Sequence, residues 1–175
     1  MKLIKTKIQG PLKIKSNIYQ DKRGYLRETF RNNLIKNKKF PFDVMSFSKK
    51  NVLRGLHLQI KKPQGKFVTV LRGKIFDVAL DCRKNSKTFG KYKLIKLNDK
   101  NRLQIYIPKN FGHAYLTLKN NTIVNYKVSN YYSPNQSICI SYLDPMINLQ
   151  LSIKKIILSK NDKNGLFIKD IMDKL

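Results

Sequence analysis

The chain has 175 residues, the size of one domain, so we expect a single domain over residues 1–175 that buries its core without disulfides or structural metal. Its 37 Lys and Arg against 10 Asp and Glu give a net charge of +27, which suggests an anionic partner such as nucleic acid, a membrane surface or a charged substrate. The lysines are spread evenly, without a helix-turn-helix, zinc-finger or RNA-binding aromatic pattern. Nucleic-acid binding is therefore disfavoured, although the positive field would attract an anionic nucleotide.

The two cysteines and the N-terminal segment indicate a cytoplasmic protein. Cys82 and Cys139 lie far apart in the sequence, which points to neither a disulfide framework nor a zinc knuckle. Charges interrupt the apolar residues between Met1 and Lys7, so a secretory signal core is missing. No segment approaches the roughly 20 apolar residues that cross a bilayer. We expect a reduced protein that does not enter the membrane.

The first thirty residues contain two expected β features. Residues 4–18 place isoleucine and leucine among lysines in a short-strand rhythm, interrupted by Gly10-Pro11, which predicts an opening β ribbon. Asp21 to Gly24 then has the composition of a tight turn, and a strand of alternating character follows up to Phe30.

From Phe42 onward, short apolar runs end in turn residues at intervals of about eight to twelve residues, the spacing of a β sandwich or barrel. The turn Arg72-Gly73-Lys74 joins two of these runs as a hairpin. The apolar spacing of residues 168–175, in the segment that begins near Lys160, predicts one short helix. The expected strands in this part cover residues 67–71, 75–81, 92–97, 103–107, 113–118, 122–128 and 138–142.

An all-β chain with glycine-rich turns and two histidines invites comparison with jelly rolls that hold a metal ion through several histidines. Such a site needs three or four converging ligands, whereas His57 and His113 have no third histidine and form no His-x-His pair. We therefore predict an all-β jelly roll, a β sandwich without a metal or other cofactor, which ends in a short C-terminal helical segment.

The stretch from residue 51 to residue 59, NVLRGLHLQ, places His57 close to Arg54 and Gly55. On a regular strand the side chains of Arg54 and His57 would point to opposite faces. A β-bulge at the glycine would let both side chains approach one ligand. Taken alone, a single histidine in such a strand is more often a buried core residue than a catalytic one. The remaining motifs strengthen the prediction that His57 is catalytic.

An ordered set of motifs runs along nearly the whole chain. The motifs are Asp21-x-Arg23-Gly24 with Glu28, NVLRGLHLQ, Gln64-Gly65-Lys66, Phe76-Asp77-Val78-Ala79-Leu80-Asp81-x-Arg83, Ser86-x-Thr88-Phe89-Gly90, Ile107-Pro108-x3-Gly112-His113-Ala114 and Asn130-Tyr131-Tyr132-Ser133-Pro134. With these motifs the chain resembles the dTDP-4-dehydrorhamnose 3,5-epimerase family. The resemblance implies a metal-free cupin-type jelly roll, usually a homodimer, that inverts C3 and C5 of dTDP-4-dehydro-6-deoxy-D-glucose to give dTDP-4-dehydro-L-rhamnose.

A keto group at C4 acidifies the hydrogens at C3 and C5, so inversion needs a base, an acid on the opposite face and a group that holds the enolate oxygen. The resemblance makes His57 the base and Asp162 the carboxylate that fixes its tautomer and stabilises the imidazolium. It makes Tyr126 the proton donor, since a phenol with an ordinary pKa of about 10 is protonated at neutral pH. Lys66 and Arg54 match positions near the keto oxygen and the diphosphate.

Four further residues match substrate contacts of the family. Arg23, Glu28 and His113 match contacts with the nucleotide sugar, and Tyr132 matches the aromatic residue that stacks on the thymine ring. By local pattern alone, Arg23 and Glu28 would be a turn charge and a strand-surface carboxylate, and Tyr132 a turn aromatic beside a proline.

The chain departs from the family pattern at several positions, and the departures keep other functions open. Phe42 and Val44 stand where the family usually carries a Gln-x-Asn pair, Ser137 replaces an acidic residue, and Asn161 replaces a lysine. An epimerase that acts only at C3 or only at C5 of a related nucleotide-4-keto sugar is the first alternative. A non-catalytic β sandwich that binds polyanions, suggested by the charge of +27, is the second.

Overall fold

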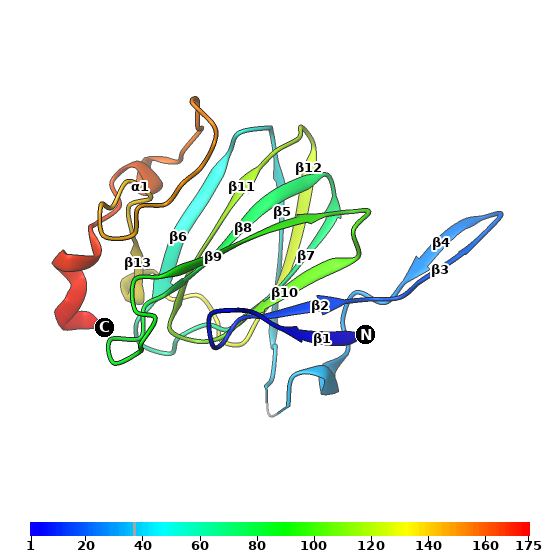
Figure 1. Cartoon of the computed structure of the whole chain (residues 1–175), viewed down its shortest axis with the longest axis horizontal. Coiled ribbons are helices and arrows are strands. Elements are labelled where there is room, and N and C mark those ends of the chain that lie inside the picture. The colour runs from blue at the N-terminus through cyan, green and yellow to red at the C-terminus, as the bar shows by residue number, and fades with distance from the viewer. Residues whose placement is uncertain (37) are drawn as a thin grey trace.

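The structure is a computed structural model that describes residues 1–36 and 38–175. Two antiparallel sheets form a β sandwich (Figure 1). The six-stranded sheet has the order β1 (Lys2–Lys5), β2 (Leu12–Lys15), β10 (Leu103–Ile107), β7 (Lys66–Arg72), β12 (Thr122–Val128), β5 (Phe42–Ser48). The five-stranded sheet has the order β13 (Ser137–Cys139), β6 (Leu53–Gln59), β11 (Phe111–Thr117), β8 (Lys74–Asp81), β9 (Tyr92–Asn98). The predicted all-β sandwich is confirmed.

The opening ribbon divides into two parts. Strands β1 and β2 join the edge of the six-stranded sheet through the pairing of β2 with β10. Strands β3 (Ile18–Asp21) and β4 (Gly24–Arg27) form a separate hairpin that extends away from the sandwich (Figure 1). The 3-10 turn η1 (Asn32–Leu34) then leads towards β5.

Strand β8 illustrates why the five-stranded sheet is apolar on both of its faces. Ile75 and Ala79 belong to the core between the sheets, whereas Val78 and Leu80 belong to a second core on the outer face. The C-terminal part of the chain covers that outer face with residues such as Ile147. Each fully buried aliphatic side chain contributes about 1.5–3 kcal/mol, so this cover stabilises the sheet substantially.

The short C-terminal helical segment that the apolar spacing predicted is confirmed, and it consists of two separate helices. It contains the α-helix α1 (Lys160–Lys163) and the 3-10 helix η3 (Ile168–Lys174), separated by an extended stretch. In that stretch Leu166 pairs with Ile140, and a side chain at Gly165 would approach the backbone of Ser141 within 2.7 Å. The helix therefore ends where the chain must lie directly against the sheet.

No helix among the described residues is long and apolar enough to span a membrane.

Gly55 produces the bulge that the sequence suggested. His57 pairs with His113 and Arg54 with Tyr115, so β6 has one residue more than β11 between the same two pairs. Gly55 has a φ of +104°, and a Cβ atom here would overlap the carbonyl oxygen of His113. The close approach of the two backbones thus requires glycine.

Gly55→Ala should lower the free energy of unfolding by about 3 kcal/mol or more, because it combines backbone strain with a backbone clash. Gly24→Ala is the matched control, since Gly24 also has a positive φ of +128° but no atom within 4 Å of its Cβ position. The control should cost about 1 kcal/mol. Urea unfolding of both variants measures the difference, and equal losses would contradict the proposed clash.

Candidate active site

A pocket of about 410 Å³ receives side chains from both sheets and from the C-terminal segment. The five-stranded sheet contributes residues of β6 and β11, and the six-stranded sheet contributes residues of β5, β7 and β12. Seven of the nine predicted site residues line it: Arg54, His57, Lys66, His113, Tyr126, Tyr132 and Asp162. The bulge at Gly55 accounts for the presence of both Arg54 and His57 in one pocket.

Two predicted site residues lie elsewhere in this chain. Arg23 sits at the tip of the β3–β4 hairpin, where its guanidinium bonds Asp21 at 2.6 Å. Glu28 follows the hairpin and pairs with Arg31 at 2.7 Å. Neither Arg23 nor Glu28 lines the pocket of its own chain.

The residues that depart from the family pattern do line the pocket. Phe42 and Val44 of β5 belong to its wall, and so do Ser137 and Asn161. The ring of Phe42 lies 5.8 Å from that of Tyr131, centroid to centroid. At Phe42 and Val44 the wall is therefore apolar, where an amide pair would have offered hydrogen bonds.

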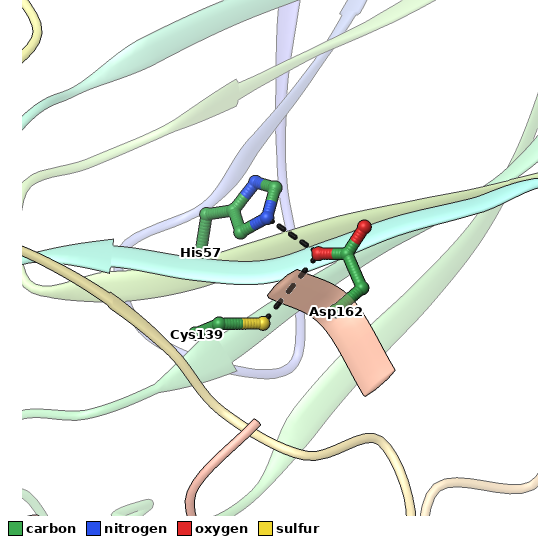
Figure 2. A group of neighbouring side chains, drawn as sticks. All are labelled: His57, Cys139 and Asp162. Atoms are coloured by element: carbon green, nitrogen blue, oxygen red, sulfur yellow. Dashed lines mark hydrogen bonds and ion pairs between the residues drawn. The ribbon is translucent and has the colours of Figure 1, made fainter. Parts of the chain in front are cut away.

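The imidazole of His57 is held by a carboxylate. Nε2 of His57 lies 2.7 Å from Oδ1 of Asp162 (Figure 2). The carboxylate can only accept, so Nε2 carries a proton and donates it to this bond. The other ring nitrogen, Nδ1, points away from Asp162 (Figure 2) and keeps a free lone pair in the neutral ring. Nδ1 is therefore the basic atom of this pair.

Asp162 is fixed by several donors that the sequence analysis did not single out. Ser159, the N-cap of α1, donates from Oγ to Oδ2 at 2.7 Å, and Cys139 donates from Sγ to Oδ1 at 3.5 Å. Burial by itself would raise the pKa of Asp162, but the hydrogen bonds from His57 and Ser159 more than offset it and lower the pKa to about 2. The spacing Ser159-x-x-Asp162 is that of a helix cap and could have identified Ser159.

His57, Cys139 and Asp162 also deserve consideration as metal ligands, because their donor atoms lie within 4.8 Å of one another. The donors are engaged with each other, however, through the two bonds to Oδ1 drawn in Figure 2. Burial raises the pKa of the Cys139 thiol to about 12, so the sulfur is protonated instead of being a thiolate ligand. The arrangement suits a hydrogen-bonded group better than a metal centre.

Tyr126 and Lys66 provide a neutral donor and a buried cation. Burial raises the pKa of Tyr126, while the charge of Arg54 lowers it, and the net effect keeps the phenol protonated. Burial lowers the pKa of Lys66 to about 8, against the charge of Asp77, which raises it. Arg54 is oriented by a bond from its Nε to Oγ of Ser48 at 3.1 Å. The pocket can thus receive a proton, donate one and stabilise an oxyanion.

Comparison with known proteins identifies the family. The family model for dTDP-4-dehydrorhamnose 3,5-epimerase matches residues 5–170. The chain belongs to this family. A curated family member from Methanothermobacter thermautotrophicus, a dTDP-4-dehydrorhamnose 3,5-epimerase, is 41% identical over 170 residues, which cover 93% of this chain and 92% of that protein.

Solved structures of epimerases share the whole fold. The enzyme from Legionella pneumophila, a dTDP-6-deoxy-D-glucose-3,5-epimerase in complex with dTDP-4-keto-L-rhamnose, is 36% identical with a TM-score of 0.96, covering 99% of this chain and 96% of that one. A 3'-monoepimerase from Streptomyces bikiniensis in complex with dTDP-quinovose is 26% identical with a TM-score of 0.89, covering 96% and 88%. Membership of the epimerase family makes the chain an isomerase with a cupin-type sandwich.

The lowered pKa of Asp162 predicts an acid-dependent loss of stability. A carboxyl group whose folded pKa lies below its ordinary value stabilises the fold above that ordinary value and loses this contribution as the pH falls towards the folded pKa. For Asp162 this pH range runs from 3.8, the ordinary pKa, down to about 2, the pKa in the folded protein. The stability lost across this window should be smaller in Asp162→Asn than in the wild type by about 2 kcal/mol. Urea unfolding at pH 4, 3 and 2 measures it; parallel curves would contradict the assigned pKa.

Proposed function

We propose that this chain, as one domain over residues 1–175, inverts C3 and C5 of dTDP-4-dehydro-6-deoxy-D-glucose to give dTDP-4-dehydro-L-rhamnose. One observation carries the proposal: His57 and Tyr126 face the same pocket from opposite sheets, β6 and β12. Inversion at carbon requires a base on one face of the sugar and an acid on the other. The ligand bound in the Legionella relative, dTDP-4-keto-L-rhamnose, is the product of this proposed reaction.

In the proposed first half of each inversion, His57 removes the proton. Nδ1 takes the hydrogen from the carbon beside the keto group, and the C–H electron pair moves into the enolate. Asp162 stabilises the resulting imidazolium through the 2.7 Å bond to Nε2. The ammonium of Lys66, buried in the pocket, would stabilise the enolate oxygen more strongly than a solvated charge could.

In the second half, Tyr126 returns a proton to the same carbon from the other face. Its hydroxyl donates to the enolate carbon, the keto group re-forms, and Tyr126 is left as a phenolate. The nearby charge of Arg54 favours that phenolate, because it lowers the pKa of Tyr126. Exchange with solvent then returns the proton from His57 and reprotonates Tyr126, so the enzyme is unchanged over one inversion.

The nucleotide would lie along the aromatic side of the pocket. Tyr132 is 59% exposed and lines the pocket, which leaves its ring face available for stacking on the thymine ring. Phe42 and Val44 would add apolar contacts to the nucleotide in place of amide hydrogen bonds. Arg54 and His113 remain the polar candidates for the diphosphate sugar.

We further propose a homodimer in which the β3–β4 hairpin reaches the pocket of the partner. An isolated two-stranded hairpin is marginally stable, and this one exposes Tyr19, Tyr25 and Leu26 by 60% or more. The edge strand β5 similarly exposes Met45 and Phe47. A second copy covering these apolar groups would explain why Arg23 and Glu28 lie outside their own pocket.

The two free, buried cysteines support a reducing, cytoplasmic location.

The first test follows deuterium by NMR when the protein acts on dTDP-4-dehydro-6-deoxy-D-glucose in heavy water. Exchange at both C3 and C5 is expected, and His57→Asn should slow it by about 100-fold to 10,000-fold because the base is lost. An unchanged circular dichroism spectrum controls for folding. Exchange at a single carbon would make the enzyme a monoepimerase like the Streptomyces relative, and no exchange would overturn the proposed activity.

Tyr126→Phe separates the acid from the base. Deuterium should still enter the substrate, because His57 and its solvent exchange remain, but inverted product should fall by about 100-fold or more. Tyr131→Phe is the matched control, since Tyr131 is 69% exposed and does not line the pocket. Inversion at the wild-type rate by Tyr126→Phe would show that another group is the acid.

Mixing two inactive variants tests the exchanged hairpin. If Arg23 serves the partner's pocket, a dimer of one His57→Asn chain and one Arg23→Ala chain carries both defects in one pocket and none in the other. An equal mixture, unfolded and refolded together, should then regain about a quarter of the wild-type activity. No recovery, with mixed dimers demonstrated by mass spectrometry, would place Arg23 with its own chain's pocket or outside catalysis.

A further inference from the structure

Asp77 is a buried carboxylate directly behind the pocket. It lies on β8, where the alternation that places Ile75 and Ala79 between the sheets also turns Asp77 inwards, and its exposed fraction is 0%. Its Oδ2 lies 2.9 Å from Nε2 of His113, which is itself only 4% exposed. The carboxylate accepts this bond, so His113 carries its proton on Nε2 and turns the rest of its ring towards the pocket.

The second oxygen of Asp77 has no hydrogen-bond partner within the described part of the chain. A buried carboxylate with an open oxygen is costly unless a positive charge lies nearby. Lys66, on β7 of the opposite sheet, supplies that charge: it is 9% exposed, and the carboxylate of Asp77 raises its pKa. Asp77 opposes the effect of burial on Lys66 without direct contact, since the two residues form no ion pair within 4.0 Å.

The other titratable groups around Lys66 do not supply a negative charge. His113 of β11 and His57 of β6 are imidazoles, and Tyr126 of β12 is a protonated phenol. Asp162 is already engaged by the imidazole of His57. Among the described residues, Asp77, which lies behind the pocket, is therefore the counter-charge of Lys66.

We propose that Asp77 is a positioning residue that keeps Lys66 in its ammonium form and fixes the ring of His113, although it touches no substrate itself. The inference rests on the proposed function, in which Lys66 stabilises the enolate. Without Asp77, no nearby negative charge would oppose the lowering of the Lys66 pKa by burial, and Lys66 would lose its proton more readily. The resulting neutral amine would be a much weaker partner for an oxyanion.

The pH profile of Asp77→Asn tests this role, because asparagine has nearly the same volume but no charge. The alkaline limb of kcat should move to a pH about 1 lower, so turnover falls by about 5-fold at pH 8 and recovers towards pH 6. Asp77→Glu should restore part of the profile. A profile for Asp77→Asn that superimposes on the wild-type profile would overturn the proposal.

Asp81→Asn is the matched control. Asp81 lies on the same strand with an exposed fraction of 0%, but its partners are Arg83, Ser86 and Thr88, away from the pocket. The control should lower the unfolding midpoint and leave the pH profile in place. A similar shift of the profile in Asp81→Asn would mean that loss of any buried charge on β8 has this effect, and that result would also overturn the proposal.

A titration without substrate separates this inference from the proposed function. The lysine side-chain carbons of the folded protein are followed by NMR against pH, with Lys66→Arg used to assign the Lys66 signal. Lys66 should titrate at a lower pH in Asp77→Asn than in the wild type, whether or not the protein epimerises a sugar. An unchanged Lys66 titration refutes the role of Asp77, whereas a shifted titration in an inactive protein refutes only the proposed activity.

Discussion

The close approach of β6 to β11 at Gly55 determines the geometry of the whole pocket. Because Gly55 has no side chain, the two backbones meet and β6 accommodates one extra residue between its pairs with β11. The bulge turns Arg54 and His57 towards the same pocket. The N–H group of Gly55 also bonds Oδ1 of Asp162 at 3.3 Å, so the same feature helps to hold the carboxylate behind the base.

Two histidines, each hydrogen-bonded to a carboxylate, lie opposite each other on neighbouring strands. Their different exposure to solvent suits them to different roles. His57 and His113 are register partners, each bonded through Nε2 to an aspartate. The side chain of His57 is 39% exposed, whereas that of His113 is 4% exposed, and burial lowers the pKa of His113. A histidine that must gain and lose a proton needs access to substrate and solvent, which favours His57 as the base and His113 as a fixed neutral contact.

The C-terminal segment links stability to catalysis. Its apolar residues cover the outer face of the five-stranded sheet, and the short helix α1 within it carries Asp162 to the pocket. Ser159 both caps that helix and bonds the carboxylate. Changes that loosen the outer core would therefore displace the partner of His57 as well as weaken the sheet.

Local patterns in the sequence determined much of this protein. Alternating apolar residues and turn residues are read from near neighbours, so the strands, the hairpin at Gly73 and the bulge at Gly55 were predictable. Ordered motifs likewise indicated the family and seven of the residues that line the pocket. Charge was less informative, since the +27 describes the whole chain and not a particular surface.

Only the tertiary structure decided which distant groups meet. His57 and Asp162 are 105 residues apart, and His113 and Asp77 are 36 apart, so no local pattern specifies either bond. The C-terminal helical segment is divided at Gly165 into α1 and η3 because the chain there packs directly on Ser141, a contact from a different part of the sequence. Local conformation follows from adjacent residues, whereas burial, pKa and hydrogen-bond partners depend on contacts that exist only once the two sheets and the C-terminal segment have packed together.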